Sequence, residues 1–370
     1  MIKKTACAFL ACLIMVCSLP FEALAKDVSG EAAIEARAQE ILKTMSTKQK
    51  VGQLFMAYVP SKEGTAVQKK YQFGGYVLFA RNFKKSNIKE KKKVISSYQK
   101  ASQIKMLIAV DEEGGYVNRV SLYKQYRKKP FGSPQKLYKV GGWSKVKKDT
   151  VEKSRLLKSM GINTNLAPVA DVPYKKSNYM YGRAFSTNAA STSKYVKMVV
   201  SKMSKEKMVS TLKHFPGYGG NGDTHSSVIR DKRKLSTFEK RDLKPFKAGI
   251  EAGCDMIMVS HNIVECFDKK NPASISPKVH KYIRKNLGFD GVIVTDGLEM
   301  SGVVKKAGCS NAEIAVRAIL AGNDMLCTSA YKEQYPAVLK AVKSGRISEK
   351  RLNDSVLRIL KMKLRRGIIK

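Results

Sequence analysis

Short apolar runs alternate with longer amphipathic stretches along most of the chain. Eight runs are rich in β-branched and aromatic residues and end in polar residues or glycine: 51–59, 74–79, 106–110, 164–169, 209–212, 256–259, 292–294 and 325–327. Such runs are typical of strands buried on both faces of a parallel sheet. Amphipathic helical patterns follow over 88–104, 146–160, 192–208, 237–252, 276–287 and 310–320, and two more, 331–342 and 348–364, close the chain. Eight β-then-α units predict a (β/α)8 TIM-type barrel, an α/β fold, with a doubly wound sheet as the alternative.

One further helix is expected ahead of the first strand. Its apolar face would carry Ile34, Ala38, Ile41, Leu42 and Met45, which recur at helical spacing. Ser46 and Gln49 then stand three residues apart, as in the capping box that begins a helix. The chain shows neither a linker rich in proline, glycine or serine nor a break in composition, so a single folded domain is expected.

Residues 1–25 have the pattern of a secretory signal peptide. Lys3 and Lys4 precede an uncharged run over 6–19, and Ala23-Leu24-Ala25 supplies the small residues that signal peptidase recognises. The run is shorter than the about 20 residues that a membrane span requires. We therefore expect a signal peptide over 1–25 that is cleaved after Ala25, a mature barrel over 26–370, and a protein that is secreted or associated with the cell envelope.

The chain is strongly basic. Its 370 residues include 70 Lys and Arg against 30 Asp and Glu, a formal charge of +40, together with 43% hydrophobic residues. The hydrophobic share suffices for a folded core, which argues against a disordered basic tail. Export would keep the protein away from nucleic acid, so the expected partner is an anionic cell wall, to which the protein would bind electrostatically. We also expect a monomer. Basic segments such as 91–93, 127–129, 147–148 and 361–366 are expected to form solvated helix faces.

Four cysteines remain after the expected cleavage: Cys254, Cys266, Cys309 and Cys327. They allow three disulfide pairings, and the sequence does not choose among these and free thiols, although partly buried free thiols are favoured. Their spacing matches no zinc pattern, and the chain carries neither a phosphate-binding loop nor a dinucleotide fingerprint. We therefore expect no metal and no cofactor.

Polar residues gather where the predicted strands end. Asp111 follows the third strand, Asp171 the fourth, Lys213-His214 the fifth and Asp296 the seventh. Three of the four histidines, His214, His225 and His261, fall at or just after the fifth and sixth strands. In a (β/α)8 barrel the carboxyl ends of the strands carry the active site, so this distribution favours a site over scattered structural histidines.

Six segments, in order along the chain, resemble a known family. They are 75–82 (Gly-Tyr-Val-Leu-Phe-Ala-Arg-Asn), 111–119 (Asp-Glu-Glu-Gly-Gly-Tyr-Val-Asn-Arg), 165–172 (Asn-Leu-Ala-Pro-Val-Ala-Asp-Val), 182–185 (Gly-Arg-Ala-Phe), 213–219 (Lys-His-Phe-Pro-Gly-Tyr-Gly) with Asp223-Thr224-His225, and 294–300 (Val-Thr-Asp-Gly-Leu-Glu-Met). Together they are similar to the motifs of glycoside hydrolase family 3, in particular its β-N-acetylglucosaminidases, or β-hexosaminidases. The family's catalytic barrel agrees with the fold predicted above.

The resemblance implies an exported, exo-acting enzyme that hydrolyses terminal β-linked N-acetylglucosamine from peptidoglycan fragments or related oligosaccharides, with retention. Asp296 would be the nucleophile that forms a covalent glycosyl-enzyme. His225 would act as general acid and then general base, because an imidazole titrates near neutral pH. Asp223 would orient His225 and stabilise its imidazolium form. Without the motifs, a buried structural Asp296 and a surface turn at 223–225 would be the preferred interpretations.

The same resemblance implies a sugar-binding set. Asp111, Arg119, Arg183, Lys213 and His214 would hold hydroxyl groups and the ring of the bound residue. For the two arginines, a structural salt bridge at the barrel mouth is the alternative interpretation. His261 and Asn262 are expected at the rim without an assigned role, and Glu299 either near the nucleophile or at a helix start.

The chain departs from the family pattern at several positions. Glu112 stands where Gln is usual, Tyr218 replaces a histidine, and Gly297 stands where Ala is common, while the loop 219–222 is changed before the catalytic pair. Two other functions stay open: a phosphorylase of the same glycosides, and a non-catalytic protein that binds the envelope through its charge. The natural substrate, whether muropeptide, chitin oligomer or glycan, also stays open.

Overall fold

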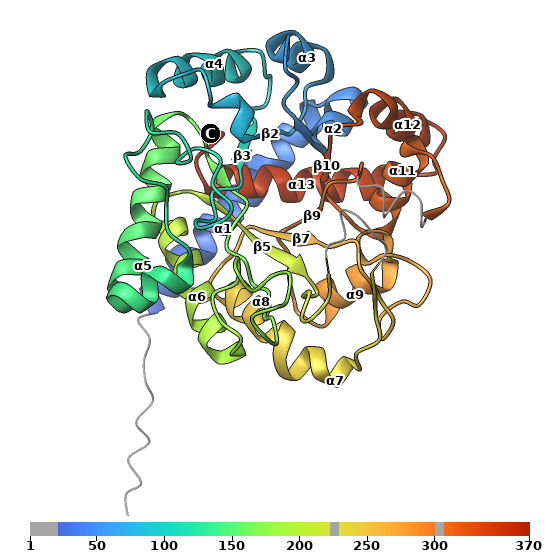
Figure 1. The fold of residues 1–370 in the computed structure, drawn as a ribbon. Helices are drawn as coiled ribbons and strands as arrows, with labels where there is room; N and C mark the ends of the chain where they lie inside the picture. The colour runs from blue at the N-terminus through green and yellow to red at the C-terminus, as the bar shows by residue number, and fades with distance from the viewer. Residues whose placement is uncertain (1–20, 223–228, 300–306) are drawn as a thin grey trace, which may run out of the picture.

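Eight parallel strands form one sheet at the centre of the computed structural model, which describes residues 21–222, 229–299 and 307–370, and side chains from residue 30 onward. They are β1 (Phe55–Tyr58), β2 (Gly75–Leu78), β3 (Leu107–Val110), β4 (Thr164–Asn165), β5 (Val209–Phe215), β7 (Met256–Val259), β9 (Val292–Thr295) and β10 (Leu326–Thr328). Their order is β10-β1-β2-β3-β4-β5-β7-β9, and a parallel bridge between Val294 and Met325 joins the last strand to the first. The sheet therefore closes into a barrel, as predicted (Figure 1).

Helices surround the barrel (Figure 1). They are α1 (Phe21–Thr44), α2 (Thr47–Gln53), α3 (Gly64–Tyr71), α4 (Ile88–Lys100), α5 (Pro134–Ser159), α6 (Ala189–Lys205), α7 (Leu235–Thr237), α8 (Leu243–Glu251), α9 (Pro277–Lys285), α11 (Asn311–Ala321), α12 (Tyr331–Lys343) and α13 (Glu349–Arg365). Most begin at a polar cap whose side-chain oxygen accepts a backbone N–H in the first turn: Ser46, Asn87, Ser133, Asn188, Ser276, Ser310 and Ser348. Such caps satisfy amide groups that a helix start leaves without partners.

The buried strands confirm the apolar runs, with three local differences. Residues 51–53 form the end of α2 rather than the start of β1, and Val51 is fully buried in that helix. β5 extends through Phe215, so that Lys213 and His214 lie within the strand and not after it. α5 starts at Pro134, earlier than predicted, with non-helical backbone at Gly141 and Gly142. Beyond the barrel, β6 (Arg230–Asp231) pairs with β8 (Ile263–Val264) in a small second sheet.

The amino-terminal helix α1 packs against α13, the last helix of the chain. Ala38, Leu42 and Met45 are buried, as the predicted apolar face requires, and Ser46 with Gln49 forms the predicted capping box. The predicted cleavage point after Ala25 lies within the first turns of α1, and most of the predicted signal peptide, residues 1–20, lies outside the described residues. None of the described helices combines the length and apolar character that crossing a membrane requires.

The basic segments differ from the expected solvated faces in two places. Lys91 is buried and donates a hydrogen bond to the backbone carbonyl of Asn82. In the segment 361–366, Lys361 pairs with Glu35 at 2.5 Å, Arg365 with Glu31 at 2.5 Å, and Arg366 with Asp255 at 2.7 Å. These cations hold α13 to its neighbours, which the run of basic residues in the sequence does not reveal. Cys254, Cys266, Cys309 and Cys327 are free thiols.

Candidate active site

A cavity of about 270 Å³ lies at the carboxyl ends of the barrel strands. Tyr58 ends β1, Asp111 follows β3, Lys213 and His214 lie in β5, and Asp296 follows β9. The other lining residues are Val77, Phe79, Val117, Arg119, Leu166, Tyr179, Arg183, Met258 and Cys327. The volume is at the small end for ligand pockets, which span roughly 300–1,000 Å³, and suits one sugar residue.

Glu113 is the centre of an ionic network on one wall of this cavity. Its carboxylate binds Arg183 through two parallel hydrogen bonds, Nε to Oε2 at 3.0 Å and Nη2 to Oε1 at 2.7 Å. Lys213 Nζ lies 2.6 Å from Glu113 Oε1 and 2.6 Å from Asp111 Oδ1, so the lysine bridges two carboxylates. The Glu113 and Lys213 side chains are each 2% exposed, whereas Asp111 is 18% exposed and faces the cavity.

Charge pairing, and not burial, sets the protonation of this network. Burial would raise the pKa of Glu113, but the charges of Lys213 and Arg183 outweigh it and hold that pKa well below its usual range. Burial would likewise lower the pKa of Lys213, yet the charges of Asp111 and Glu113 raise it above its ordinary value. Glu113 is therefore ionised and Lys213 protonated at neutral pH. A protonated lysine between two carboxylates positions hydrogen-bonding groups and does not act as a base.

His214 is held in one tautomer by Asp171. The Asp171 carboxylate is fully buried and lies 2.8 Å from His214 Nδ1, and it also accepts the backbone N–H groups of His214 at 3.1 Å and Tyr218 at 2.8 Å. On the other side of the ring, Nε2 lies 3.4 Å from Arg183 Nη2. Because a guanidinium only donates, this arrangement requires Nδ1 to carry the proton and Nε2 to accept. Asp171 therefore fixes the orientation of the His214 ring, with Nε2 toward Arg183 at the cavity wall.

Arg119 reaches the cavity from a loop that Glu112 organises. The buried Glu112 carboxylate accepts the backbone N–H groups of Arg119 at 2.8 Å, Val120 at 2.8 Å and Ser121 at 3.1 Å. Arg119 Nε is buried without a hydrogen-bond partner among the residues that the structure describes. A donor left without a partner is costly, so this guanidinium is suited to take up a substrate oxygen. The departure from Gln to Glu at position 112 thus fits a loop-supporting role.

Asp296 lines the same cavity from another strand, just past the end of β9. Its Oδ1 accepts the N–H of Gly297 at 2.8 Å, and its own backbone N–H binds the carbonyl of Val259 at 3.0 Å. His261 is buried, with Nδ1 2.7 Å from Ser274 Oγ and Nε2 2.9 Å from the carbonyl of Gly297. The histidine therefore supports the turn that carries Asp296, and has the structural role that the sequence left unassigned.

Tyr58 occupies space beside Asp296 that a side chain at position 297 would otherwise need. A Cβ atom on Gly297 would lie 2.6 Å from Tyr58 Oη. Burial, with the nearby groups Cys327, Glu299 and Asp296, raises the pKa of Tyr58 well above its ordinary value. Burial and the charges of Glu299 and Asp296 likewise raise the pKa of Cys327. Both groups stay protonated, so the thiol in the cavity is no nucleophile, because only a thiolate attacks efficiently.

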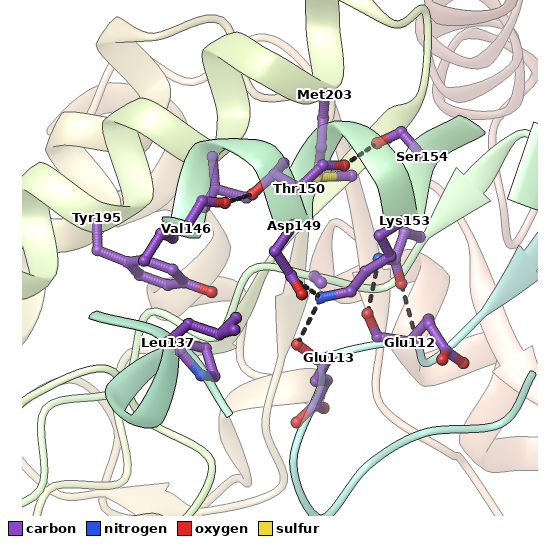
Figure 2. A pocket seen from close by; sticks show the side chains of 14 residues that line it. Glu112, Glu113, Leu137, Val146, Asp149, Thr150, Lys153, Ser154, Tyr195 and Met203 are labelled. Atoms are coloured by element: carbon purple, nitrogen blue, oxygen red, sulfur yellow. Dashed lines mark hydrogen bonds and ion pairs between the residues drawn. The ribbon is translucent and has the colours of Figure 1, made fainter. Parts of the chain in front are cut away.

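Lys153 of α5 supports the loop that carries Glu112 and Glu113 (Figure 2). Its Nζ lies 3.0 Å from Asp149 Oδ2 and donates at 3.1 Å to the backbone carbonyl of Glu113. Figure 2 shows Asp149 and Lys153 on the same helix, both pointing toward the loop that carries Glu112 and Glu113. The adjoining cavity of about 20 Å³ is too small for a sugar. Helix α5 therefore fixes the backbone from which Glu113 reaches its two cations.

Six residues predicted from the sequence line this one cavity: Asp111, Arg119, Arg183, Lys213, His214 and Asp296. Asp223 and His225, the predicted orienting carboxylate and acid/base, lie outside the described residues. Sequence reasoning missed Glu113 as the partner of both cations and Tyr58 as the neighbour of Gly297. Glu113 could have been found from the sequence, since it stands two residues after Asp111 at the end of the same strand. For Tyr58 the only indication was its position at the end of β1. Among the described residues, no cluster of three or more His, Cys, Asp or Glu suits a metal ion.

Comparison with known proteins supports a common family. The model of the glycosyl hydrolase family 3 N terminal domain matches residues 46–362. An uncharacterized secreted glycosyl hydrolase of Arthroderma benhamiae is 30% identical over 89% of this chain and 95% of its own length, and a beta-hexosaminidase of Methylococcus capsulatus is 30% identical over 73% and 80%. The solved structure of a glycoside hydrolase family 3 beta-N-acetylglucosaminidase from a Paenibacillus species superposes with a TM-score of 0.80 at 30% identity, covering 88% of this chain and 63% of that one.

Proposed function

The chain belongs to glycosyl hydrolase family 3, and we propose that it is an exported β-N-acetylglucosaminidase that removes terminal N-acetylglucosamine with retention. It is a glycoside hydrolase of the β-hexosaminidase type. Cell-wall fragments or related oligosaccharides are its proposed substrates, because these carry the sugar that its beta-hexosaminidase relatives are named for. The mature enzyme would begin at Lys26, which intact-mass measurement of the secreted protein tests.

One observation carries the proposal: the Asp296 carboxylate shares a one-sugar cavity with a charged hydrogen-bonding wall. Asp111 offers a partly exposed acceptor, and Arg119 a buried donor, while Lys213 and Arg183 are held by Glu113. Fixed donors and acceptors of this kind hold sugar hydroxyls and place the anomeric carbon for attack. Such a wall does not need to reorganise when charge develops in the transition state.

The proposed reaction has two displacements. A carboxylate oxygen of Asp296 attacks the anomeric carbon while the glycosidic C–O bond breaks, and His225 transfers a proton to the departing oxygen. Water then attacks the glycosyl-enzyme as His225 takes back a proton, which releases the sugar and regenerates the Asp296 carboxylate. The assignments of His225 and Asp223 rest on the sequence resemblance, and that of Asp296 also on its place in the cavity.

Turnover of p-nitrophenyl N-acetyl-β-glucosaminide tests the activity. Hydrolysis should exceed that of the corresponding glucoside and should not need phosphate. Asp296→Asn should lower kcat by about 10⁴-fold or more, since it removes the nucleophile. Asp290→Asn is the matched control, because Asp290 is exposed and pairs only at 3.3 Å with Arg358 on the outside of the barrel.

Other outcomes separate the alternatives. A rate that requires phosphate and gives a sugar 1-phosphate would establish a phosphorylase instead. Full turnover by Asp296→Asn would reject the nucleophile. His225→Ala should slow substrates with poor leaving groups more than activated ones, and equal losses on both would reject the acid role of His225.

A further inference from the structure

Two adjoining cavities lie along helix α5, and neither shares a lining residue with the sugar cavity. One, of about 700 Å³, is lined by Arg127, Lys147, Lys148, Arg155 and Lys202 together with Tyr126, Val151, Glu152 and Leu156. The other, of about 300 Å³, adds Lys129, Lys136 and Lys145 and shares Arg127, Lys148 and Glu152 with the first. The shared residues make the two cavities one continuous groove, which we call the α5 groove.

The cations of the α5 groove fall into two kinds. Both arginines are already paired: Arg127 binds Glu152 through Nε at 2.8 Å and Nη2 at 3.2 Å, and Arg155 binds Glu206 through Nε at 3.2 Å and Nη2 at 3.1 Å. The lysines are exposed or half-buried and have no carboxylate partner among the described residues: Lys129, Lys136, Lys145, Lys147, Lys148 and Lys202. The groove therefore concentrates positive charge that the protein itself does not neutralise.

This concentration of charge is not shared by all basic segments of the chain. At the end of α13, Lys361, Arg365 and Arg366 pair with carboxylates of other elements, namely Glu35, Glu31 and Asp255. Six unpaired lysines around a groove repel one another, which an anion laid along the groove would relieve. Charge complementarity thus indicates an extended anionic ligand.

We propose that the α5 groove binds a linear phosphodiester polymer of the cell envelope. The free cations are all lysines, whose compact ammonium groups bind phosphate as point charges, and the two arginine forks, which would match carboxylate or phosphate, are occupied by Glu152 and Glu206. A groove suits a chain of repeating charges better than a single small anion. The choice of an envelope polymer rests on the proposed export of the enzyme.

The position of the groove links this binding to the active site. Helix α5 begins at Pro134, directly after the loop over 111–133 that carries Asp111 and Arg119, and its residue Lys153 holds the carbonyl of Glu113. The α5 groove includes Lys129 and Pro130 of that loop. A polymer bound here therefore lies beside the rim of the barrel and retains the enzyme on the wall without filling the sugar cavity.

The test uses the whole mature protein and purified poly(glycerol phosphate). The triple variant Lys145→Gln/Lys147→Gln/Lys148→Gln removes three exposed lysines of the groove. Lys89→Gln/Lys92→Gln/Lys93→Gln is the matched control, since these are exposed lysines of α4 outside the groove and the change in net charge is the same. The groove variant should bind about 100-fold more weakly at low salt, at about 1 kcal/mol per lysine, and the control within a few-fold of wild type. Added salt should weaken wild-type binding steeply.

Three results would overturn the proposal. Equal weakening by both triple variants would mean diffuse attraction to the whole basic surface. Poly-glutamate binding as tightly as poly(glycerol phosphate) would reject phosphate recognition, and single-stranded DNA binding more tightly would point to nucleic acid. Both variants should turn over the chromogenic N-acetylglucosaminide at the wild-type rate, which shows that they fold. Absence of that turnover in wild type would instead reject the proposed enzyme activity and leave the binding result standing.

Discussion

A methyl group added at Gly297 collides with the hydroxyl of Tyr58. The Cβ of Gly297→Ala would lie 2.6 Å from Tyr58 Oη, against 3.4 Å for the nearest ordinary van der Waals contact. The tyrosine ring, or the turn that carries Asp296, therefore has to move by about 0.8 Å. Overpacking of this kind costs about 1–3 kcal/mol. Misplacement by about 1 Å near reacting groups can cost about 10²-fold in rate.

We therefore expect Gly297→Ala to lower kcat/KM by about 10- to 100-fold. Tyr58→Phe removes the atom that collides, so the double variant Tyr58→Phe/Gly297→Ala should recover most of the loss. Tyr58→Phe alone should have a smaller effect, because it keeps the ring and introduces no steric collision. The coupling between the two substitutions should reach at least about 1 kcal/mol in the rescuing direction.

The assay is a double-mutant cycle on kcat/KM with the chromogenic N-acetylglucosaminide, paired with urea unfolding of all four proteins. The unfolding free energies separate loss of fold from displacement of Asp296. If the effects of the two substitutions simply multiply, Tyr58 and Gly297 do not share space in the functional enzyme. If the double variant is as impaired as Gly297→Ala, the collision lies elsewhere, and Glu299 Oε1, 3.0 Å from the added Cβ, becomes the atom to remove.

Two further predictions concern buried ionisable groups. Glu113→Gln leaves Arg183 and Lys213 with one carboxylate fewer, so it should destabilise the protein by about 3–5 kcal/mol and lower kcat/KM. The folded pKa of Glu113 lies below the unfolded value of 4.5, so its stabilisation is present above pH 4.5 and is lost as the pH falls. Urea unfolding from pH 6 to 3 measures this loss, and the free energy of unfolding of Glu113→Gln should fall less steeply with pH than that of the wild type. Lys363 is fully buried against Gln53 Oε1 at 2.7 Å, and burial lowers its pKa from 10.5 to about 7. The unfolded chain then binds more protons than the folded protein between pH 7 and 10.5, so wild-type stability should rise over this range, by up to roughly 5 kcal/mol relative to Lys363→Met. The free energy of unfolding of both proteins, measured against pH, checks this. Parallel curves would show that Lys363 does not titrate in this way.

The barrel could be predicted because its strands are continuous apolar runs and its helices keep a strict helical period. The missed elements show where that signal ends. Val51 is fully buried at the end of α2, and a short buried helix and a short buried strand leave the same apolar pattern in the sequence. The strands β6 and β8 have two residues each, too few to show any period.

The candidate site was predictable to the extent that its residues follow strands. Asp111, Lys213 and Asp296 come from different strands, and the rule that strand ends meet at one face brings them together. This rule does not predict which of the side chains at the strand ends pair with one another. That Glu113 neutralises both Lys213 and Arg183, rather than binding substrate itself, depends on side-chain geometry across three elements.

The sequence also does not reveal which basic residues are paired with a carboxylate in the fold. The net charge of +40 says that the surface is basic, but a lysine in the sequence carries no sign of whether a carboxylate faces it in the fold. Lys361 and Lys148 both stand in basic segments, yet Lys361 binds Glu35 at 2.5 Å and Lys148 lines the α5 groove. Only the unpaired cations can gain from an external anion without first breaking a bond within the protein. Which part of the charge is available to a partner therefore depends on packing: α1 against α13 brings Glu35 to Lys361, whereas six lysines along the α5 groove have no carboxylate partner among the described residues.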